Sequence, residues 1–419
     1  MAGFISKCYA HAISATMLKK IPVHQLCCGM YVHTICGSWL SHDFWRTSFL
    51  IETTAVLEKL QSSAIQAVWI DTDRGSDVAQ EVDTPAALNA PVALPTPPNV
   101  PSTLAQELEH ATALCAASSD AVMDMFNEAR MGQAVNVASG SELVEAITAS
   151  VQRHPSALIS VARLKTADNY TFMHSVAVSG LMVALARTLG HNDEQIHQAG
   201  MAGLLHDIGK ARTCPDILNK PGKLTQEEFE HMKQHPVDSY DLLQGHVDDE
   251  LVLDACLHHH ERMDGKGYPH GLDRTQISTL SRMTSICDVY DAITSDRPYK
   301  RGWSPSVALE RMAQWAGEQL DPDIFEAFIK TIGIYPMGSL VRLQSGLLGV
   351  VCAPSENSLS TPRIMAFYHV PQQRLLRPAR LIDLAKTPQE VIVAREDPAD
   401  WPFENLDSLW QRAAAALPN

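Results

Sequence analysis

The sequence lacks an apolar run long enough to cross a bilayer as a helix, which takes about 20 residues. Its longest apolar stretch, residues 176–186, is interrupted by Ser179 and Gly180 and ends at Arg187. The first sixteen residues carry charge and have no continuous apolar segment of the kind found in signal peptides. We therefore expect no membrane insertion and a cytoplasmic location.

An excess of positive charge is also lacking. Lys and Arg number 33 against 48 Asp and Glu, which gives a net charge of −15. Proteins that bind DNA or RNA polymers need a basic face that displaces counterions, so the composition argues against that class. A small anionic substrate stays compatible, because metal ions and a few cationic side chains can reverse the potential inside one cleft.

A regular cysteine pattern is missing as well. The nine cysteines are odd in number and irregularly spaced between Cys8 and Cys352. Such spacing in a long chain argues against a disulfide framework and for a reducing compartment.

A group of potential zinc ligands lies near the N-terminus, but its spacing matches no zinc finger. Residues 30–32, between these side chains, have the pattern of a buried strand. We expect small buried thiols and surface histidines here rather than a metal site. The group consists of His24, Cys27, Cys28, His33 and Cys36.

A chain of 419 residues, 45% of them apolar, is expected to fold as roughly two or three domains with a sizeable core. Residues 17–80 alternate between strand-like pieces (30–32 and 67–70) and a helical piece (53–60), which predicts a small α+β domain. Residues 81–102 form an extended linker, because six prolines fall among small residues with almost no charge.

Residues 103–332 have a helical period almost throughout, which predicts an all-α domain. Thr103 with Gln106 and Ser139 with Glu142 have capping-box spacing, so each pair is expected to open a helix. Residues 333–419 differ: two apolar strands, 340–343 and 348–352, flank a Ser-Gly turn and predict a β-rich module.

The helical region concentrates imidazoles and carboxylates in five separate segments. A lone His or a His-Asp pair is weak as a signal, and we expect His231, His246, His258 and His270 to be bystanders. Five segments together favour a centre for iron, manganese or zinc, and an Asp that follows a His can bridge two ions. Two ions about 3.5–4 Å apart can activate water and hold a phosphate. The candidate ligands are His174, His206, Asp207, His235, His259, His260 and Asp288.

Positive charge near these residues suits phosphate groups. Lys210 lies one turn from His206 if that helix continues, where it would offset charge on a phosphoryl oxygen. Arg297 and Lys300 follow Asp288 and suit a second phosphate. Gly265, Gly267 and Pro269 predict a constrained loop that backbone can use to approach a ligand.

The segments HDIGK and HHERMDGKGYP resemble the HD-GYP family of metal-dependent phosphohydrolases. ILNKPGKLTQEEFEHMKQHP and CDVYDAITSDRPYKR extend the resemblance over residues 174–303. KKIPVHQLCCGMYV, SWLSHDF and VWIDTDRG resemble a domain of unknown function that commonly precedes HD-GYP domains. The resemblance implies hydrolysis of cyclic di-GMP to pGpG or GMP, with two divalent ions, iron or manganese.

Position by position, the resemblance assigns the seven candidate ligands to the metals and Asp207 and Lys210 to catalysis. It assigns substrate contacts to Lys210, Gly267, Tyr268, Arg297 and Lys300. Some family members have a glutamate four residues before the first His, which helps hold a third metal. That position is Tyr170 here, so we expect the two-metal subtype.

Two other functions stay open: a slow cyclic di-GMP receptor that signals by protein contact, and a phosphohydrolase of another nucleotide. A homodimer through residues 104–131 is a hypothesis based on the apolar and Met-rich character of that segment. A protein partner could instead bind through the N-terminal domain.

Overall fold

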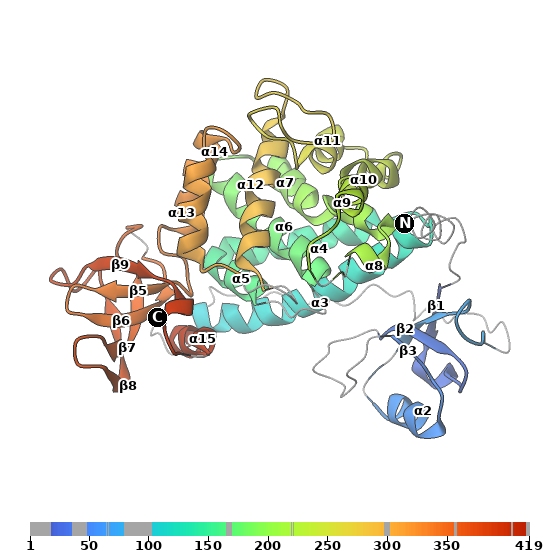
Figure 1. Ribbon diagram of the computed structural model, residues 1–419, viewed down its shortest axis with the longest axis horizontal. Helices are drawn as coiled ribbons and strands as arrows, with labels where there is room; N and C mark the ends of the chain where they lie inside the picture. The colour runs from blue at the N-terminus through green and yellow to red at the C-terminus, as the bar shows by residue number, and fades with distance from the viewer. Residues whose placement is uncertain are drawn as a thin grey trace.

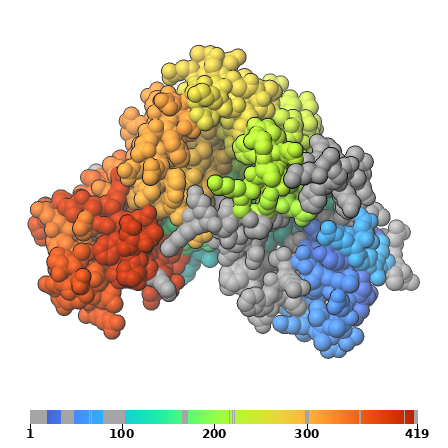
Figure 2. Space-filling model, in the orientation of Figure 1, coloured from blue at the N-terminus to red at the C-terminus, as the bar shows by residue number. Residues whose placement is uncertain are grey.

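The computed structural model describes residues 18–35, 48–63, 65, 67–78, 103–164, 170–218, 220, 222–296, 302–355, 358–403 and 405–415. These residues form a small N-terminal unit of strands and a helix, a central helical unit, and a C-terminal sheet with one helix (Figure 1). The mostly helical architecture with two strand-containing regions agrees with the sequence prediction. In the space-filling view the N-terminal and C-terminal units lie at opposite ends of the helical unit (Figure 2). The proline-rich segment and the first seventeen residues fall outside the described part.

The N-terminal unit is an antiparallel sheet covered by one helix. Strand order is β1-β4-β2-β3, and apolar side chains such as Val32, Leu60 and Ile70 fill the space beneath it. The helix begins after Thr53, whose hydroxyl accepts the Val56 N–H as an N-cap should. The elements are β1 (Leu18–Pro22), β2 (Tyr31–Ile35), β3 (Phe49–Leu50), α2 (Thr54–Gln61) and β4 (Ala67–Asp71).

The expectation of buried thiols in this unit is wrong for two cysteines. Cys27 and Cys28 are exposed, because Met30 and Leu26 occupy the interior positions around them. Cys36 lies outside the described residues. Among the residues described, no group of potential metal ligands includes His24 or His33.

The central unit packs its helices around α6, which is apolar on all sides and therefore buried. The apolar run of residues 176–186 forms this core helix. No helix in the described ranges is long and apolar enough to cross a membrane. The helices are α3 (Leu104–Arg130), α4 (Val137–Arg153), α5 (Pro155–Arg163), α6 (Tyr170–Thr188), α7 (Asp193–Leu205), η5 (Ile208–Arg212), α8 (Pro215–Leu218), α9 (Gln226–Met232), α10 (His235–Leu243), α11 (Glu250–His258), α12 (Thr279–Thr294), α13 (Pro305–Trp315) and α14 (Pro322–Ile332).

One of the two expected capping boxes is confirmed. Thr103 and Gln106 make both reciprocal hydrogen bonds at the start of α3. Ser139 with Glu142 does not open α4, because Asn136 precedes it as the N-cap and accepts the Ser139 N–H. An Asn side chain three residues earlier thus starts the helix sooner than expected.

The apolar face of α3 packs inside the chain. Leu114, Val122, Met125 and Phe126 are buried in the same core as α6 and α7. The apolar character that suggested a dimer surface over residues 104–131 therefore has an explanation within one chain.

The C-terminal unit is a five-stranded antiparallel sheet in the order β8-β7-β6-β5-β9. The expected hairpin is confirmed as β5 and β6, with Gly346 in the left-handed conformation at the turn. A helix that we did not expect, α15, buries Trp410 against this sheet and Leu108 of α3. The elements are β5 (Leu340–Leu343), β6 (Leu347–Ala353), β7 (Arg363–His369), β8 (Arg374–Asp383), β9 (Ile392–Glu396) and α15 (Leu406–Ala415).

Candidate active site

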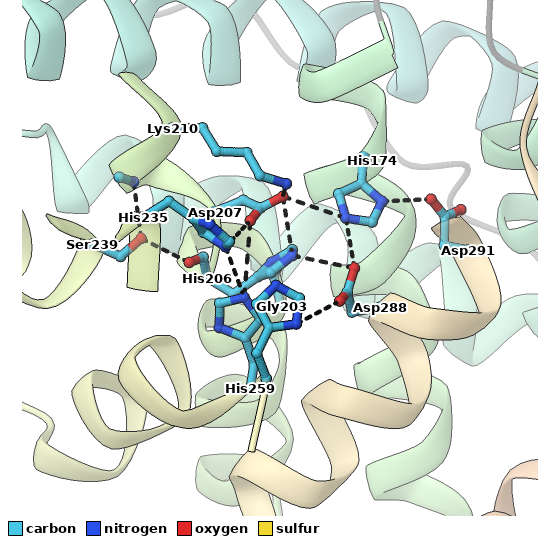
Figure 3. Close-up of polar contacts among 12 residues, drawn as sticks. His174, Gly203, His206, Asp207, Lys210, His235, Ser239, His259, Asp288 and Asp291 are labelled. Carbon is cyan, nitrogen blue, oxygen red and sulfur yellow. Dashed lines mark hydrogen bonds and ion pairs between the residues drawn. The ribbon is translucent and has the colours of Figure 1, made fainter. Parts of the chain in front are cut away.

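The structure brings all seven candidate ligands together in the middle of the helical unit. Figure 3 labels six of them, all except His260. The seven come from three helices, α6, α10 and α12, and from the residues that follow α7 and α11. Six of them are buried and His260 is half-buried. The positions are His174 on α6, His206 and Asp207 after α7, His235 at the start of α10, His259 and His260 after α11, and Asp288 on α12.

Asp207 lies between two groups of imidazoles. Its Oδ2 is 3.5 Å from the Nε2 atoms of both His174 and His206. Its Oδ1 is 3.2 Å from His235 Nε2 and 3.9 Å from His259 Nε2. The two carboxylate oxygens therefore face different sets of nitrogen donors, which is the arrangement of a bridging ligand.

Asp288 and His260 complete the two groups of ligands, one on each side of Asp207. Asp288 Oδ1 lies 3.0 Å from His174 Nε2 and 3.9 Å from His206 Nε2. The ligand atoms of His235, His259 and His260 lie within 4.8 Å of one another. One half thus has two imidazoles and Asp288, the other has three imidazoles, and Asp207 joins them.

Four of the five imidazoles are oriented by a hydrogen bond from the ring nitrogen that faces away from the centre. His206, His235 and His259 donate Nδ1–H to the carbonyl oxygens three residues earlier in the chain, at 2.9, 2.7 and 2.8 Å. His174 Nδ1 instead contacts the buried carboxylate of Asp291 at 2.6 Å. These bonds fix the tautomer that leaves Nε2 free as a ligand.

The donor set fits divalent metal ions. His206 Nε2 and Asp207 Oδ1 are buried and have no hydrogen-bond partner, an arrangement that costs free energy unless something else satisfies them. Imidazole and carboxylate donors suit iron, manganese or zinc. Burial raises the pKa of the nearby thiols of Cys256 and Cys287, so they stay protonated and are poor ligands.

The electrostatics of the site keep Asp207 charged and two of the imidazoles neutral. Burial opposes ionisation of Asp207, but Lys210 and the surrounding histidines hold its pKa well below the usual range. Burial lowers the pKa of His259 strongly and that of His260 to about 3. The carboxylate is therefore charged and these two imidazoles are neutral at neutral pH.

Lys210 reaches the centre by a different route from the expected one. The α-helix ends at Leu205, and residues 208–212 form the 3-10 helix η5. Residues three apart eclipse in a 3-10 helix, so Lys210 stands over Asp207 instead of His206. Its Nζ donates to Asp207 Oδ2 at 2.5 Å.

Gly209 lets η5 pack directly on α10, a feature that sequence reasoning missed. A Cβ at this position would lie 2.1 Å from the His235 carbonyl oxygen. Ser239 on α10 donates to the His206 carbonyl and accepts the Gly209 N–H. Both ligand-bearing segments are thus joined by the Ser239 hydroxyl and by the close packing at Gly209.

The loop after α11 covers His260 with Tyr268. The two rings lie 4.7 Å apart, and the Tyr268 N–H donates to the His260 carbonyl. The close approach expected at Gly267 is made with the chain's own backbone, since a Cβ there would lie 2.4 Å from the Cα of Glu261. Glu261, also missed, is buried and accepts the N–H groups of residues 270–272.

Some expectations fall outside the described part of the structure. Arg297 and Lys300 lie there, and so does the side chain of Tyr170. Asp291 and Glu261 had a detectable signal, because each is an acidic residue within three positions of a candidate ligand. His258 and His270 contact each other through ring nitrogens 2.9 Å apart.

Two domain families match the sequence. One is described as "Domain of unknown function (DUF3391)" and covers residues 18–139; the other, "HD domain", covers residues 145–324. The chain is 51% identical over 399 residues to cyclic di-GMP phosphodiesterase PA4108 of Pseudomonas aeruginosa. The match covers 94% of this chain and 96% of that protein.

Two further relatives match the central region alone. The response regulator RpfG of Xanthomonas campestris, a cyclic di-GMP phosphodiesterase, is 39% identical over 155 residues (36% of this chain, 40% of that protein). The 3'3'-cGAMP-specific phosphodiesterase 1 of Vibrio cholerae is 37% identical over 164 residues (39% and 38%).

A helical domain that gathers five histidines and two aspartates around a shared carboxylate defines a metal-dependent phosphohydrolase of the HD class. Within that class, the chain belongs to the HD-GYP family of phosphodiesterases, with an N-terminal DUF3391 region.

Proposed function

We propose that the chain hydrolyses cyclic di-GMP at the centre around Asp207. The observation that carries the proposal is the position of Asp207, whose two oxygens face separate groups of imidazoles. The relative that matches along nearly the whole chain is named a cyclic di-GMP phosphodiesterase, which supports the same substrate.

The chain's own residues would prepare and bind the reacting phosphate. Two divalent ions, iron or manganese, held by the seven candidate ligands would supply Lewis acidity and an activated water. Asp207 stays ionised between the halves, and Lys210 beside it places an ammonium group where negative charge develops on a phosphoryl oxygen.

The loop and the segment after α12 would bind the rest of the dinucleotide. Tyr268 packs against His260 at the edge of the centre, and burial keeps its phenol protonated so that it can donate a hydrogen bond. We assign the second phosphate to Arg297 and Lys300, with Gly267 shaping the loop. Tyr170 replaces the glutamate that helps hold a third metal, so pGpG is the proposed end product.

A second candidate substrate is another cyclic dinucleotide. It is favoured by one observation, the 37% identity of the central region to a 3'3'-cGAMP-specific phosphodiesterase. Competition between cyclic di-GMP and 3'3'-cGAMP, measured as the ratio of kcat/KM values, decides between the two.

The decisive experiment measures hydrolysis of cyclic di-GMP by anaerobically purified protein loaded with iron or manganese. Wild-type turnover to pGpG that vanishes in Asp207→Ala supports the proposal. Tight binding without turnover in fully metallated protein would contradict it and indicate a receptor instead.

We also propose domain boundaries and a location. The α+β domain takes residues 17–80, the linker 81–102, the catalytic domain 103–332 and the β-rich module 333–419. A cytoplasmic enzyme fits the cysteine pattern, and the N-terminal region is the proposed site of a protein partner.

A further inference from the structure

The C-terminal part of α3 contacts the N-terminal unit through charged and polar side chains. Lys20 on β1 places its Nζ 2.7 Å from Asp124 Oδ2, and both side chains are about three-quarters buried. Trp69 on β4 donates its Nε1–H to the other oxygen of Asp124 at 3.4 Å. One carboxylate on α3 thus holds two strands of the sheet.

Arg130, at the end of the same helix, extends this contact towards the catalytic centre. Its Nη1 lies 3.5 Å from Nε2 of His33 on β2. Its Nε donates to the carbonyl oxygen of Ala211 in η5 at 3.3 Å. The guanidinium therefore bridges the N-terminal sheet and the segment that carries Lys210.

The charge state of the bridge favours this arrangement. Burial, reinforced by the charge of Arg130, lowers the pKa of His33 to about 4, so the imidazole is neutral and its Nε2 can accept a hydrogen bond. Within the described ranges, no carboxylate pairs with the Arg130 guanidinium. Its hydrogen bonds are instead directed to the ring nitrogen on one side and the main chain of η5 on the other.

The end of α3 also supports the opposite side of the centre. Phe126 packs edge-to-face on Phe172 of α6, with ring centroids 5.4 Å apart. Phe172 lies two residues before His174. The same two turns of α3 thus contact α6 near one ligand and η5 near Lys210, while they bind the N-terminal sheet on their outer side.

A single family match includes both the N-terminal sheet and α3. The match to the domain of unknown function covers residues 18–139, so it includes both the N-terminal sheet and the whole of α3. Although α3 packs in the helical core, its sequence belongs with the sheet.

We propose that Arg130 is a positioning residue that couples the N-terminal unit to η5, so that binding of the sheet to α3 sets the position of Lys210 and Asp207. The activity readout of this inference rests on the proposed function. A change in how the sheet sits on α3 would reach the centre through Arg130 without any contact between the sheet and the substrate.

The test compares Arg130→Met, His33→Ala and Asp124→Ala in the full-length, metal-loaded protein. Arg311→Met, the same substitution at an exposed arginine of α13, is the matched control. Three quantities are measured: kcat and KM for cyclic di-GMP, and the hydrogen-exchange rate of the amides of residues 208–213. If Arg130→Met fails to fold, Arg130→Lys, which keeps the charge but lacks the fork, replaces it.

We expect Arg130→Met to speed amide exchange in η5 and lower kcat by about 2- to 30-fold, the range of such couplings, with KM unchanged. His33→Ala and Asp124→Ala should likewise speed amide exchange in η5 and lower kcat, and Arg311→Met should change neither. Unchanged exchange and kcat in Arg130→Met would overturn the inference. The inference would also be overturned if only Arg130→Met had an effect, because the N-terminal unit would then not be coupled to η5. Exchange is informative even if wild-type protein fails to hydrolyse cyclic di-GMP, which would refute only the proposed function.

Discussion

Asp291 illustrates how one residue outside the ligand set can control the metal centre. Its buried carboxylate contacts His174 Nδ1 at 2.6 Å, which orients the ring and keeps its Nε2 pointed at Asp288. Partners of this kind raise ligand basicity and restrict ring rotation. The ligand and its support lie on neighbouring helices, α6 and α12, so packing of these helices determines the geometry.

We predict that Asp291→Ala weakens metal binding by about 10- to 100-fold, with a parallel loss of activity at limiting metal. Titration of metal-free protein with manganese, followed by calorimetry, measures the affinity. Asp400→Ala, at an exposed position in the C-terminal unit, is the control. Equal affinities of Asp291→Ala and wild type would show that His174 is held without Asp291.

Gly209 gives a second prediction at this scale. Gly209→Ala would place a methyl group 2.1 Å from the His235 carbonyl oxygen, so η5 or α10 must move. We expect loss of activity and a fall of about 1–3 kcal/mol in the free energy of unfolding, as overpacking typically causes. Denaturant unfolding and a hydrolysis assay measure the two effects.

The control for Gly209 is Gly140→Ala in α4, where the added Cβ would make only ordinary contacts of 3.5 Å or more. A helix-interior glycine exchanged for alanine should stabilise the protein by about 0.5–1 kcal/mol. Full activity in Gly209→Ala would show that the two segments can separate without cost to the centre.

Among the elements, the loop after α11 depends on one buried carboxylate. Glu261 accepts main-chain N–H groups from His270 and Gly271 at 2.7 and 3.0 Å, and a third from Leu272. These bonds close the loop that carries Tyr268. The loop is thus held by its own acidic residue.

We predict that Glu261→Ala raises KM for cyclic di-GMP by roughly 10-fold or more, because three main-chain N–H groups of the loop lose their buried, charged acceptor. Metal content should stay at the wild-type level, which distinguishes a loop effect from loss of a ligand. Steady-state kinetics and metal analysis on the same preparation provide the test, with exposed Glu318→Ala as control. A wild-type KM would contradict the assigned role of the loop.

Local signals predicted several helix starts and turns, whereas a contact between distant segments accounts for the departure around Lys210. Thr103 with Gln106 marked the start of α3, and Gly346 marked the β5–β6 turn, because caps and turns depend on neighbouring residues. The α-helix does not continue to Lys210: residues 208–212 form η5, and Gly209 packs on α10, thirty residues further along. The seven candidate ligands were recognisable as a set, but the division of Asp207 between two groups required the fold.

At the scale of the whole molecule, an acidic pair lies where the N-terminal unit meets α3. Burial, aided by the charge of Asp124, raises the pKa of Asp120 to about 6. A carboxyl with a raised pKa in the folded state favours folding when protonated. The contribution of Asp120 to the free energy of unfolding is therefore present at low pH and is lost as pH rises from about 4 through 6.

We predict that Asp120→Asn removes this penalty and stabilises the protein at pH 7 by up to about 2–3 kcal/mol, since one pKa unit corresponds to about 1.4 kcal/mol. The gain should shrink below pH 5, where the wild-type carboxyl is protonated. Thermal unfolding of both proteins between pH 4.5 and 8 measures it, with exposed Asp400→Asn as control. A gain independent of pH would rule out titration of Asp120 as the cause.

Helix α3 has 27 residues and is therefore about 40 Å long. Its N-terminal half packs on the C-terminal unit through Leu108 and Trp410, and its last turns hold the N-terminal sheet through Asp124. In a chimaera that replaces the N-terminal unit with another sensor, the position of the junction therefore determines which protein supplies α3. A junction in the proline-rich segment keeps α3 with the enzyme and leaves its core intact. A junction after residue 139 would replace α3, the helix that all three parts contact.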